Sequence, residues 1–349
     1  MSEVVRGALA QVVEGMTLSL DEAYRAMGSV MDGEATASQL AALLVALRMR
    51  GETVEELAGF ARAMRERVLR VEAPAGAIDT CGTGGDGSNT FNISTAAALV
   101  VASAGIPVAK HGNRAMTSRC GSADVLEALG VATDLNPVEA GEAMATDRFA
   151  FLFAMAYHPA MKHAGPTRKE IGVRTAFNLL GPLTNPAGAR RQVLGVGAAS
   201  AAPKLAEVLR ILGAERALVV HGDGLDELPL DGRGVLYDVR PTGVTRHEIV
   251  ARDLGLTEAP VAALVGGTPA ENAAIVESIL AGGEAGPRRD VVLLNAAAAF
   301  MASGRAEDLG HGISLASEAI DGGAPTRLLE RLRQAKKTRD AARMAGATA

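Results

Sequence analysis

The residues best suited to chemistry lie between positions 79 and 130, where a short apolar segment opens into the glycine-rich run D-T-C-G-T-G-G-D-G. Glycine has no Cβ, so several backbone N–H groups can converge on one anion in such a loop. Residues 94–104 follow with a helical pattern, and the N-terminus of a helix adds partial positive charge at the same place. The stretch is therefore typical of a phosphate-binding loop.

The glycine spacing alone does not identify the phosphate compound. Residues 82–87 fit G-x-G-x-x-G, but a dinucleotide site also needs an acidic residue about 20 residues on, after the next strand. That strand is predicted over 106–109, and it ends in the basic run K-H-G-N-R at 110–114. The G-K-[ST] ending of a P-loop is missing as well. The basic run favours a ligand with phosphates at two ends; a tight turn and a solvated charged loop are the structural alternatives.

A pair of acids is the second candidate. Asp226 and Glu227 follow a predicted buried strand and a glycine turn. Adjacent acids usually face solvent, so the pair alone is weak evidence. Beside a bound polyphosphate, however, such a pair suits Mg²⁺, which is commonly held by one or two carboxylates plus substrate phosphates.

A basic stretch at 157–186 is the third candidate. Arg168 and Arg174 lie there with Lys162 and Lys169, and arginine suits a planar carboxylate. The alternative is a helix with a solvated basic face. His158 and His163 lie five residues apart, which is wrong for a zinc pair on one helical face, so they are interpreted as polar lining or structural residues.

The elements that position these clusters fall into two groups. The first seventy residues read as helices with three capping boxes, starting at Ser19, Thr36 and Thr53, and are interpreted as a packing or dimerisation module. Pro74 and Gly76 mark a boundary. The predicted domains are an N-terminal helical domain over 1–72 and an α/β domain over 76–335.

Beyond the boundary, short β-rich segments alternate with helical patterns. Strands are predicted at 106–109, 148–153, 192–196 and 216–220. Helices are predicted at 122–129, 137–146, 202–212, 270–280 and 291–302. This alternation predicts a mainly parallel sheet with helices on both faces, whose ligands bind beyond the carboxyl ends of the strands. The polar clusters at 81–89, 110–119 and 221–227 all follow predicted strands.

Composition narrows the class of protein. A net charge of −5 and 3% aromatic residues argue against a nucleic-acid-binding protein. Two cysteines without C-x-x-C spacing suit reduced thiols. The N-terminus does not resemble a signal peptide, and no apolar run approaches the ~20 residues that span a bilayer. The expected location is cytoplasmic, without membrane partners.

The motifs together resemble the anthranilate phosphoribosyltransferases. The runs that carry the resemblance are D-T-C-G-T-G-G-D, N-I-S-T, K-H-G-N-R, G-S-A-D-V-L-E-A-L-G, R-T-x-F-N-L-L-G-P-L-T-N-P and D-G-L-D-E. The resemblance implies a small helical domain joined to a larger α/β domain of the nucleoside phosphorylase and class II phosphoribosyltransferase type, and a homodimer. It also implies transfer of the phosphoribosyl group of 5-phosphoribosyl 1-diphosphate to anthranilate in tryptophan biosynthesis.

The resemblance also implies site residues. Phosphoribosyl diphosphate would be contacted by Gly82, Gly85, Asp86, Thr90, Asn92, Ile93, Ser94, Thr95, Lys110, His111, Gly112, Asn113, Arg114, Ala115, Met116, Thr117, Ser118 and Ser122. Anthranilate would be contacted by Gly82, Asn113 and Arg168, with Arg168 at its carboxylate. Two Mg²⁺ ions per monomer would be held, one by Ser94 and Glu227 and the other by Asp226 and Glu227. Thr117, Arg119, Cys120 and residues 228–234 depart from the family pattern, which leaves fine ligand contacts there open.

No general base is expected, because the attacking aromatic amine is already neutral at pH 7. Two alternatives remain. One is a pyrimidine nucleoside phosphorylase-like enzyme, whose phosphate loop has a different glycine and lysine pattern. The other is a non-catalytic nucleic-acid-binding relative, which predicts a basic surface and loss of the acidic pair; the negative net charge and the intact Asp226 and Glu227 argue against it.

Overall fold

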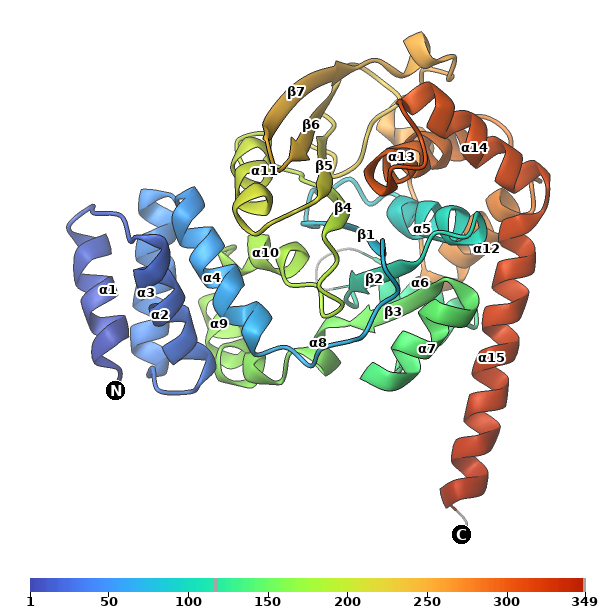
Figure 1. Cartoon of the computed structure of the whole chain (residues 1–349). Helices are drawn as coiled ribbons and strands as arrows, with labels where there is room; N and C mark the ends of the chain where they lie inside the picture. The colour runs from blue at the N-terminus through green and yellow to red at the C-terminus, as the bar shows by residue number, and fades with distance from the viewer. Residues whose placement is uncertain (116–118, 348–349) are drawn as a thin grey trace.

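The computed structural model describes residues 1–115 and 119–347. A helical bundle formed by the N-terminal segment packs beside a larger α/β domain, and the C-terminal helix extends from the far side of that domain (Figure 1). This arrangement confirms the predicted fold class. The predictions for Met116, Thr117 and Ser118 lie outside the described residues.

Four helices make the bundle: α1 (Glu3–Val13), α2 (Leu20–Met31), α3 (Ala37–Arg50) and α4 (Val54–Glu66). The three predicted capping boxes are confirmed. Ser19, Thr36 and Thr53 each accept a hydrogen bond from the backbone N–H three residues later, and that residue's side chain accepts one from the capping residue in return. These reciprocal bonds satisfy N–H groups that a helix end leaves without partners, so local side chains determine where α2, α3 and α4 begin.

The α/β domain is built on a seven-stranded sheet of order β3-β2-β1-β4-β5-β6-β7. The strands are β1 (Ile78–Gly82), β2 (Val108–Gly112), β3 (Phe149–Phe153), β4 (Arg191–Gly195), β5 (Arg216–His221), β6 (Gly234–Arg240) and β7 (Gly243–Ile249). The first five pair in parallel, as predicted. The last two form an antiparallel hairpin at one edge. The sequence patterns do not predict this hairpin.

Helices cover both faces of the sheet, as predicted. The α-helices are α5 (Ile93–Ser103), α6 (Ser122–Ala128), α7 (Pro137–Asp147), α8 (Ala154–Tyr157), α9 (Gly165–Ile171), α10 (Phe177–Leu180), α11 (Ala202–Ile211), α12 (Pro269–Leu280), α13 (Pro287–Ser303), α14 (Leu309–Asp321) and α15 (Ala324–Ala347). Short 3₁₀ helices are η1 (Pro159–His163), η2 (Gly181–Leu183), η3 (Ala251–Leu254) and η4 (Val261–Leu264). Helices α5 and α13 are buried almost all round, because they pack against the sheet on one side and α14 or α15 on the other.

The apolar core has two main parts. One lies between the sheet and α5, α12, α13, α14 and α15. The other is shared by the bundle helices α1–α4, the segment containing α9 and α10, and helix α11 on the opposite face of the sheet. The bundle is therefore packed directly on the segment that carries Arg168 and Arg174.

Strand β2 corrects one prediction. The expected strand 106–109 instead runs over Val108–Gly112, so Lys110 and His111 are strand residues with buried side chains rather than the start of a loop. A lysine can occupy this position because its Nζ donates to the backbone oxygen of Thr80, at 2.6 Å. A charge with such a partner is tolerated in an interior that would otherwise reject it. No helix of the described part of the chain is long and apolar enough to cross a membrane.

Candidate functional site

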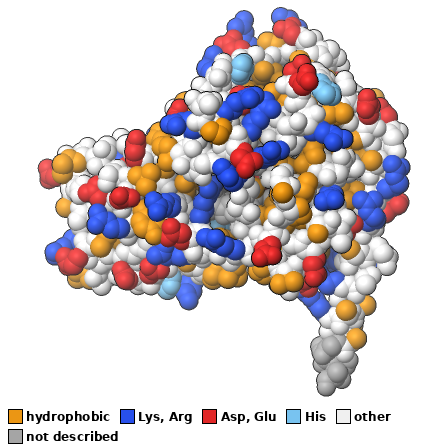
Figure 2. All heavy atoms as spheres, viewed as in Figure 1, with side chains coloured by type: hydrophobic (Ala, Val, Ile, Leu, Met, Phe, Trp, Pro, Cys, Tyr) orange, Lys and Arg blue, Asp and Glu red, His pale blue; other side chains and the backbone are white. Residues whose placement is uncertain are grey.

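The loops after β1, β2 and β5 lie at the carboxyl ends of the parallel strands. Gly82 aligns with Gly195 of β4, and Gly195 aligns with Val220 of β5, so the carboxyl ends of these parallel strands are level. The glycine loop and the Asp226–Glu227 segment therefore meet, as the strand-end clusters predict. Lys and Arg side chains gather around a hollow between the bundle and the α/β domain (Figure 2).

Asp226 is held against the glycine loop. Its Oδ2 accepts a hydrogen bond from the Gly84 N–H at 2.8 Å. A Cβ added at Gly82 would lie 2.3 Å from that same oxygen, and one added at Gly195 would lie 1.6 Å from the Asp226 backbone oxygen. Glycine is thus required on two adjacent strands because the acidic segment passes directly over them.

Glu227 lies at the N-terminus of α5. Its Oε1 accepts a hydrogen bond from the Ser94 N–H at 3.0 Å, where the helix carries partial positive charge. The next residue, Leu228, is fixed by Asn295 of α13, whose amide accepts from the Leu228 N–H at 2.9 Å and donates to the Leu228 oxygen at 3.1 Å. The sequence patterns do not predict this role of Asn295. Its signal was a lone amide inside an apolar, alanine-rich helix.

Burial makes both carboxylates poor acids. The pKa of Asp226 is raised to about 6 by burial and by the charge of Asp86, and that of Glu227 to about 8 by burial and by the charge of Asp226. A cation beside the pair would offset these costs, since an opposite charge favours the ionised form.

The donor set suits Mg²⁺ only when a ligand completes it. Two carboxylates and the Ser94 hydroxyl supply hard oxygen donors, which Mg²⁺ prefers. Within the described residues, no group of three or more His, Cys, Asp or Glu side chains could hold a metal by itself. The residues therefore fit a Mg²⁺ ion that takes its remaining ligands from phosphate and water.

Lys110 lies beneath the loop rather than in front of it. Its Nζ donates to Thr80 O, and Ser94 Oγ lies 3.4 Å away. Burial lowers the pKa of Lys110, while nearby Asp79 opposes that shift. Asp79 is itself buried and accepts from the His111 N–H at 3.1 Å and from Asn185 Nδ2 at 2.8 Å. Burial raises its pKa to about 6.

Two histidines form a buried pair beside this network. The Nε2 atoms of His111 and His158 lie 3.3 Å apart, so one ring donates to the other. Burial lowers the pKa of His111 to about 3 and that of His158 to about 4. Both rings are therefore neutral at pH 7. The structural interpretation of His158 agrees with this placement.

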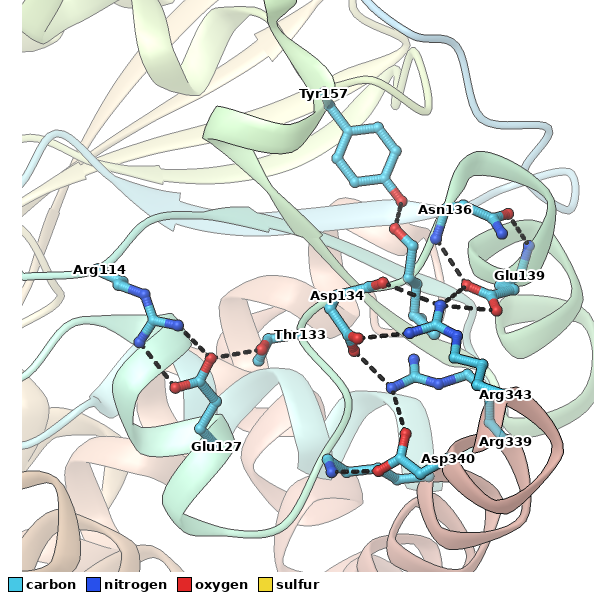
Figure 3. Close-up of polar contacts among 12 residues, drawn as sticks. Arg114, Glu127, Thr133, Asp134, Asn136, Glu139, Tyr157, Arg339, Asp340 and Arg343 are labelled. Atoms are coloured by element: carbon cyan, nitrogen blue, oxygen red, sulfur yellow. Dashed lines mark hydrogen bonds and ion pairs between the residues drawn. The ribbon is translucent and has the colours of Figure 1, made fainter. Parts of the chain in front are cut away.

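The segment after β2 folds back onto α6. The Asn113 oxygen accepts from Ser122 Oγ and from the Ala123 N–H, each at 3.2 Å. Arg114 forms ion pairs with Asp124 at 3.2 Å and Glu127 at 2.6 Å. The Arg114 guanidinium is thus engaged by α6 in this structure, and Figure 3 shows its contact with Glu127.

Two further predicted residues, Asn92 and Thr95, lie at the start of α5. Asn92 precedes the helix and links two segments, since its side chain donates to the Cys120 oxygen and accepts from Asn272. Thr95 is buried, and its hydroxyl has no hydrogen-bond partner among the residues that the structure describes. Asp86 accepts from Ser88 and from the Asp226 N–H, which connects the two ends of the loop region.

Arg168 and Arg174 have different environments. The Arg168 guanidinium stacks on the Phe177 ring at 4.8 Å, and in the described chain it makes no hydrogen bond or ion pair. Burial lowers its pKa. Arg174 instead donates to the oxygens of Gly84 at 3.1 Å and Gly85 at 3.4 Å.

The sequence identifies Arg174 only as part of a basic stretch and does not predict its contact with the loop. A Cβ at Gly85 would lie 1.8 Å from Arg174 Nη1, so this glycine also makes room for a side chain from another segment. The Gly84 residue is thus held from two sides, through its N–H by Asp226 and through its oxygen by Arg174.

The His158 ring predicts a pH-dependent stability. The unfolded chain protonates this ring near pH 6.5 and the folded chain only near pH 4, so the unfolded state binds more protons between these values. The free energy of unfolding should therefore fall as the pH falls, by up to about 1.4 kcal/mol per pH unit from this ring. The His158→Gln variant lacks this contribution. The free energy of unfolding of the parent minus that of the variant, measured by urea unfolding, should therefore decrease from pH 7.5 to pH 5.

Tyr157→Phe is the matched control. Tyr157 is the buried neighbour of His158, and burial raises the pKa of its hydroxyl, so it does not titrate in this range. The difference in free energy of unfolding between the parent and Tyr157→Phe should not change with pH. A constant gap for His158→Gln would contradict the assignment of a neutral buried ring.

Comparisons with known proteins agree with this geometry. Residues 75–326 match the α/β domain of a glycosyl transferase family, and residues 6–68 match the helical bundle domain of that family. The anthranilate phosphoribosyltransferase of Symbiobacterium thermophilum is 53% identical over 332 residues, covering 95% of this chain and 97% of the relative. That of Chloroflexus aurantiacus is 54% identical over 332 residues, with the same coverage.

Solved structures of such enzymes share the fold. The anthranilate phosphoribosyltransferase from Thermus thermophilus has a TM-score of 0.90 at 47% identity and covers 95% of this chain and 99% of its own. The Saccharomyces cerevisiae enzyme, in complex with PRPP and Mg, has a TM-score of 0.88 at 28% identity and covers 97% and 99%. Identity near 50% over nearly the whole length confirms the resemblance inferred from the motifs. The chain belongs to the anthranilate phosphoribosyltransferase family.

Proposed function

We propose that the protein transfers the phosphoribosyl group of 5-phosphoribosyl 1-diphosphate to the amine of anthranilate, releasing diphosphate, in tryptophan biosynthesis. The observation that carries the proposal is the meeting of Asp226 with the glycine loop and of Glu227 with the N-terminus of α5. The names of the relatives support the same reaction and do not favour the two alternatives.

The chemistry needs stabilisation of charge more than proton transfer. Breaking the bond between ribose C1 and diphosphate develops negative charge on the leaving group, and loop N–H groups with the α5 N-terminus would stabilise it. The attacking amine is neutral at pH 7, so no general base is assigned. Holding both substrates in line can supply about 7–11 kcal/mol of the barrier reduction.

Mg²⁺ is part of the proposal, with two ions per monomer. Ser94 and Glu227 would hold one ion, and Asp226 with Glu227 the other. When bound, such ions neutralise charge on the diphosphate. The solved complex of the yeast enzyme with PRPP and Mg supports the use of the metal. Lys110 would act from below, holding Ser94 and adding positive charge under the diphosphate.

Anthranilate would bind at Arg168, Asn113 and Gly82. Arg168 supports this assignment, because its guanidinium is partly buried on an aromatic ring and its donors are available for a carboxylate. The other predicted contacts to phosphoribosyl diphosphate, the domain limits 1–72 and 76–335, the homodimer and the cytoplasmic location stay predictions. The predicted C-terminal limit of the α/β domain, residue 335, falls inside α15, which continues to Ala347.

The reaction can be followed by the loss of anthranilate fluorescence on mixing with phosphoribosyl diphosphate and Mg²⁺. The parent should consume anthranilate, whereas Asp226→Asn with Glu227→Gln should lose at least 99% of the Mg²⁺-dependent rate. The unfolding temperature should be equal or higher, because two partly buried carboxylates whose ionisation is disfavoured are removed. Asp223→Asn, an exposed acid in the same turn, is the control and should keep the rate. A folded parent without turnover would sink the proposed reaction.

Arg168→Ala tests the acceptor site. The variant should raise the anthranilate KM at least tenfold, because the carboxylate loses a charged partner worth about 1.5–3 kcal/mol. The KM for phosphoribosyl diphosphate should change less than threefold. Lys169→Ala, at the exposed next position of α9, should leave both constants unchanged. Equal rises in both constants for Arg168→Ala would argue against a carboxylate contact.

Arg174→Ala tests the loop contact. The variant cannot donate hydrogen bonds to the Gly84 and Gly85 oxygens, so the glycine loop is held only by Asp226. The KM for phosphoribosyl diphosphate should therefore rise about tenfold, with little change in the KM for anthranilate. Gly85→Ala should act in the same direction, since its Cβ would displace the guanidinium. The double variant should be less than additive. Full additivity would mean that the two residues act independently and would contradict this contact.

A further inference from the structure

The backbone ladder between β1 and β2, which are neighbours in the sheet (Figure 1), is interrupted after its first step. In the described chain these strands pair only at Ile78 and Val108, whereas β1 with β4 and β2 with β3 each pair over five residues. A continued parallel ladder would bring the His111 N–H to the Thr80 oxygen and the Thr80 N–H to the Ala109 oxygen. The interruption therefore lies toward the carboxyl ends of the strands, where the glycine loop begins.

Two buried side chains, Asp79 and Asn185, bind the backbone groups at this interruption. The Ala109 oxygen accepts from Asn185 Nδ2 at 2.8 Å, and the His111 N–H donates to Asp79 Oδ1 at 3.1 Å. Asn185 Nδ2 also donates to Asp79 Oδ2 at 2.8 Å, so the two side chains form one unit. Buried backbone groups almost always have a hydrogen-bond partner, and this pair supplies the partners that the ladder does not.

The Asn185 amide has one favourable orientation. Its Oδ1 accepts from the Ala187 N–H at 2.8 Å, while Nδ2 donates to Asp79 and to the Ala109 oxygen. A flipped amide would set a donor against the Ala187 N–H and an oxygen against two acceptors, so all three contacts would be lost. The segment after η2 thus fixes the amide that in turn fixes Asp79.

The Lys110 side chain takes the place of the missing ladder bond. Its Nζ donates to the Thr80 oxygen at 2.6 Å, the oxygen that the His111 N–H would bind in a continued ladder. The ammonium also lies 3.4 Å from Ser94 Oγ, at the start of α5. Burial raises the pKa of Glu227, and the charge of Lys110 opposes that rise. The buried ammonium therefore acts on the acids of the candidate metal site.

We propose that Asp79 and Asn185 are positioning residues that keep the β1–β2 ladder open and so place the Lys110 ammonium beneath the phosphoribosyl diphosphate site. Both side chains are buried, so they act through Lys110 and not on the ligand itself. The inference rests on the proposed function, because it concerns the same phosphate site. A purely structural pair would contribute to folding alone, whereas a positioning pair also determines the affinity for the phosphate compound.

The test measures binding of phosphoribosyl diphosphate with Mg²⁺ by isothermal titration calorimetry, which needs no turnover. Asp79→Asn keeps the shape of the side chain, but in either orientation its Nδ2 meets a donor, the His111 N–H or Asn185 Nδ2. The Kd should rise at least tenfold. By Coulomb's law alone the loss of a negative charge would tighten binding of an anion, so unchanged or tighter binding would contradict the proposal.

Lys110→Met tests through which group the pair acts. Alone it should raise the Kd at least tenfold, because the ammonium is gone. In the Lys110→Met background, Asp79→Asn should change the Kd less than twofold, since the group that Asp79 positions is absent. A tenfold effect of Asp79→Asn in both backgrounds would mean that Asp79 acts by another route, and would overturn the proposal.

The swap Asp79→Asn with Asn185→Asp restores the contact with donor and acceptor exchanged. The amide at position 79 can then donate to the carboxylate at position 185. The Kd of the swap should lie within fivefold of the parent value, whether or not Asp79→Asn folds alone. A folded swap variant that binds at least tenfold more weakly than the parent would contradict positioning by the pair.

Thr184→Val is the matched control. Thr184 is the buried neighbour of Asn185, and its hydroxyl donates to the Leu180 and Gly181 oxygens of its own turn. Its Kd should stay within twofold of the parent value. A loss as large as that in Asp79→Asn would mean that any disturbance of this segment weakens binding, and the pair would have no special role.

The binding of the parent separates this inference from the proposed function. A parent that does not bind phosphoribosyl diphosphate would overturn the proposed function and this inference with it. A parent that binds it, with unchanged affinity in Asp79→Asn, would overturn this inference alone. Thermal unfolding checks that each variant is folded.

Discussion

The hydrogen bond from the Gly84 N–H to Asp226 joins the glycine loop to the acidic segment of the proposed phosphate site, and several local features permit it. It requires that the acidic segment cross directly over β1 and β4, which is possible only with glycine at 82 and 195. It also requires that the segment be fixed from behind, which Asn295 does by binding both backbone groups of Leu228. A single amide of a distant helix therefore helps to position the acids.

The segment held by this contact also places its two acids where ionisation is disfavoured. Burial works against ionisation of Asp79, Asp226 and Glu227, and Lys110 is the buried cation that lies among them. Such an arrangement is costly for folding, and in the proposed reaction a bound cation with its polyphosphate would offset that cost. This is how an interior can favour a magnesium complex without a dedicated metal cage.

Sequence patterns predicted the features that depend on local chemistry. The capping boxes located three helix starts, and the strand-end clusters identified the edge where the acids and the glycine loop meet. The patterns failed where distant partners decide. Nothing near Lys110 in the sequence shows that the Thr80 backbone oxygen will accept a hydrogen bond from its ammonium group, so the predicted strand ends too early. Arg174 and Asn295 were missed for the same reason, because their partners lie about 70 to 90 residues away in the chain. The β6–β7 hairpin follows the parallel part and carries little apolar alternation in β7, whose residues are mostly exposed.

The shared core beneath the bundle has a consequence for how the molecule can be divided. Bundle residues such as Leu44 and Phe60 belong to one apolar cluster with Phe177 of α10 and Leu205 of α11. The segment that contains Arg168 and Arg174 is thus packed against the N-terminal bundle, whereas Asp226 and Glu227 follow a strand of the sheet. In a chimera that joined the bundle of one relative to the sheet of another, the side chains of this shared core would not match. The segment that carries Arg168 would then shift. The two matched family segments, residues 6–68 and 75–326, therefore share one apolar core although they match separate family domains.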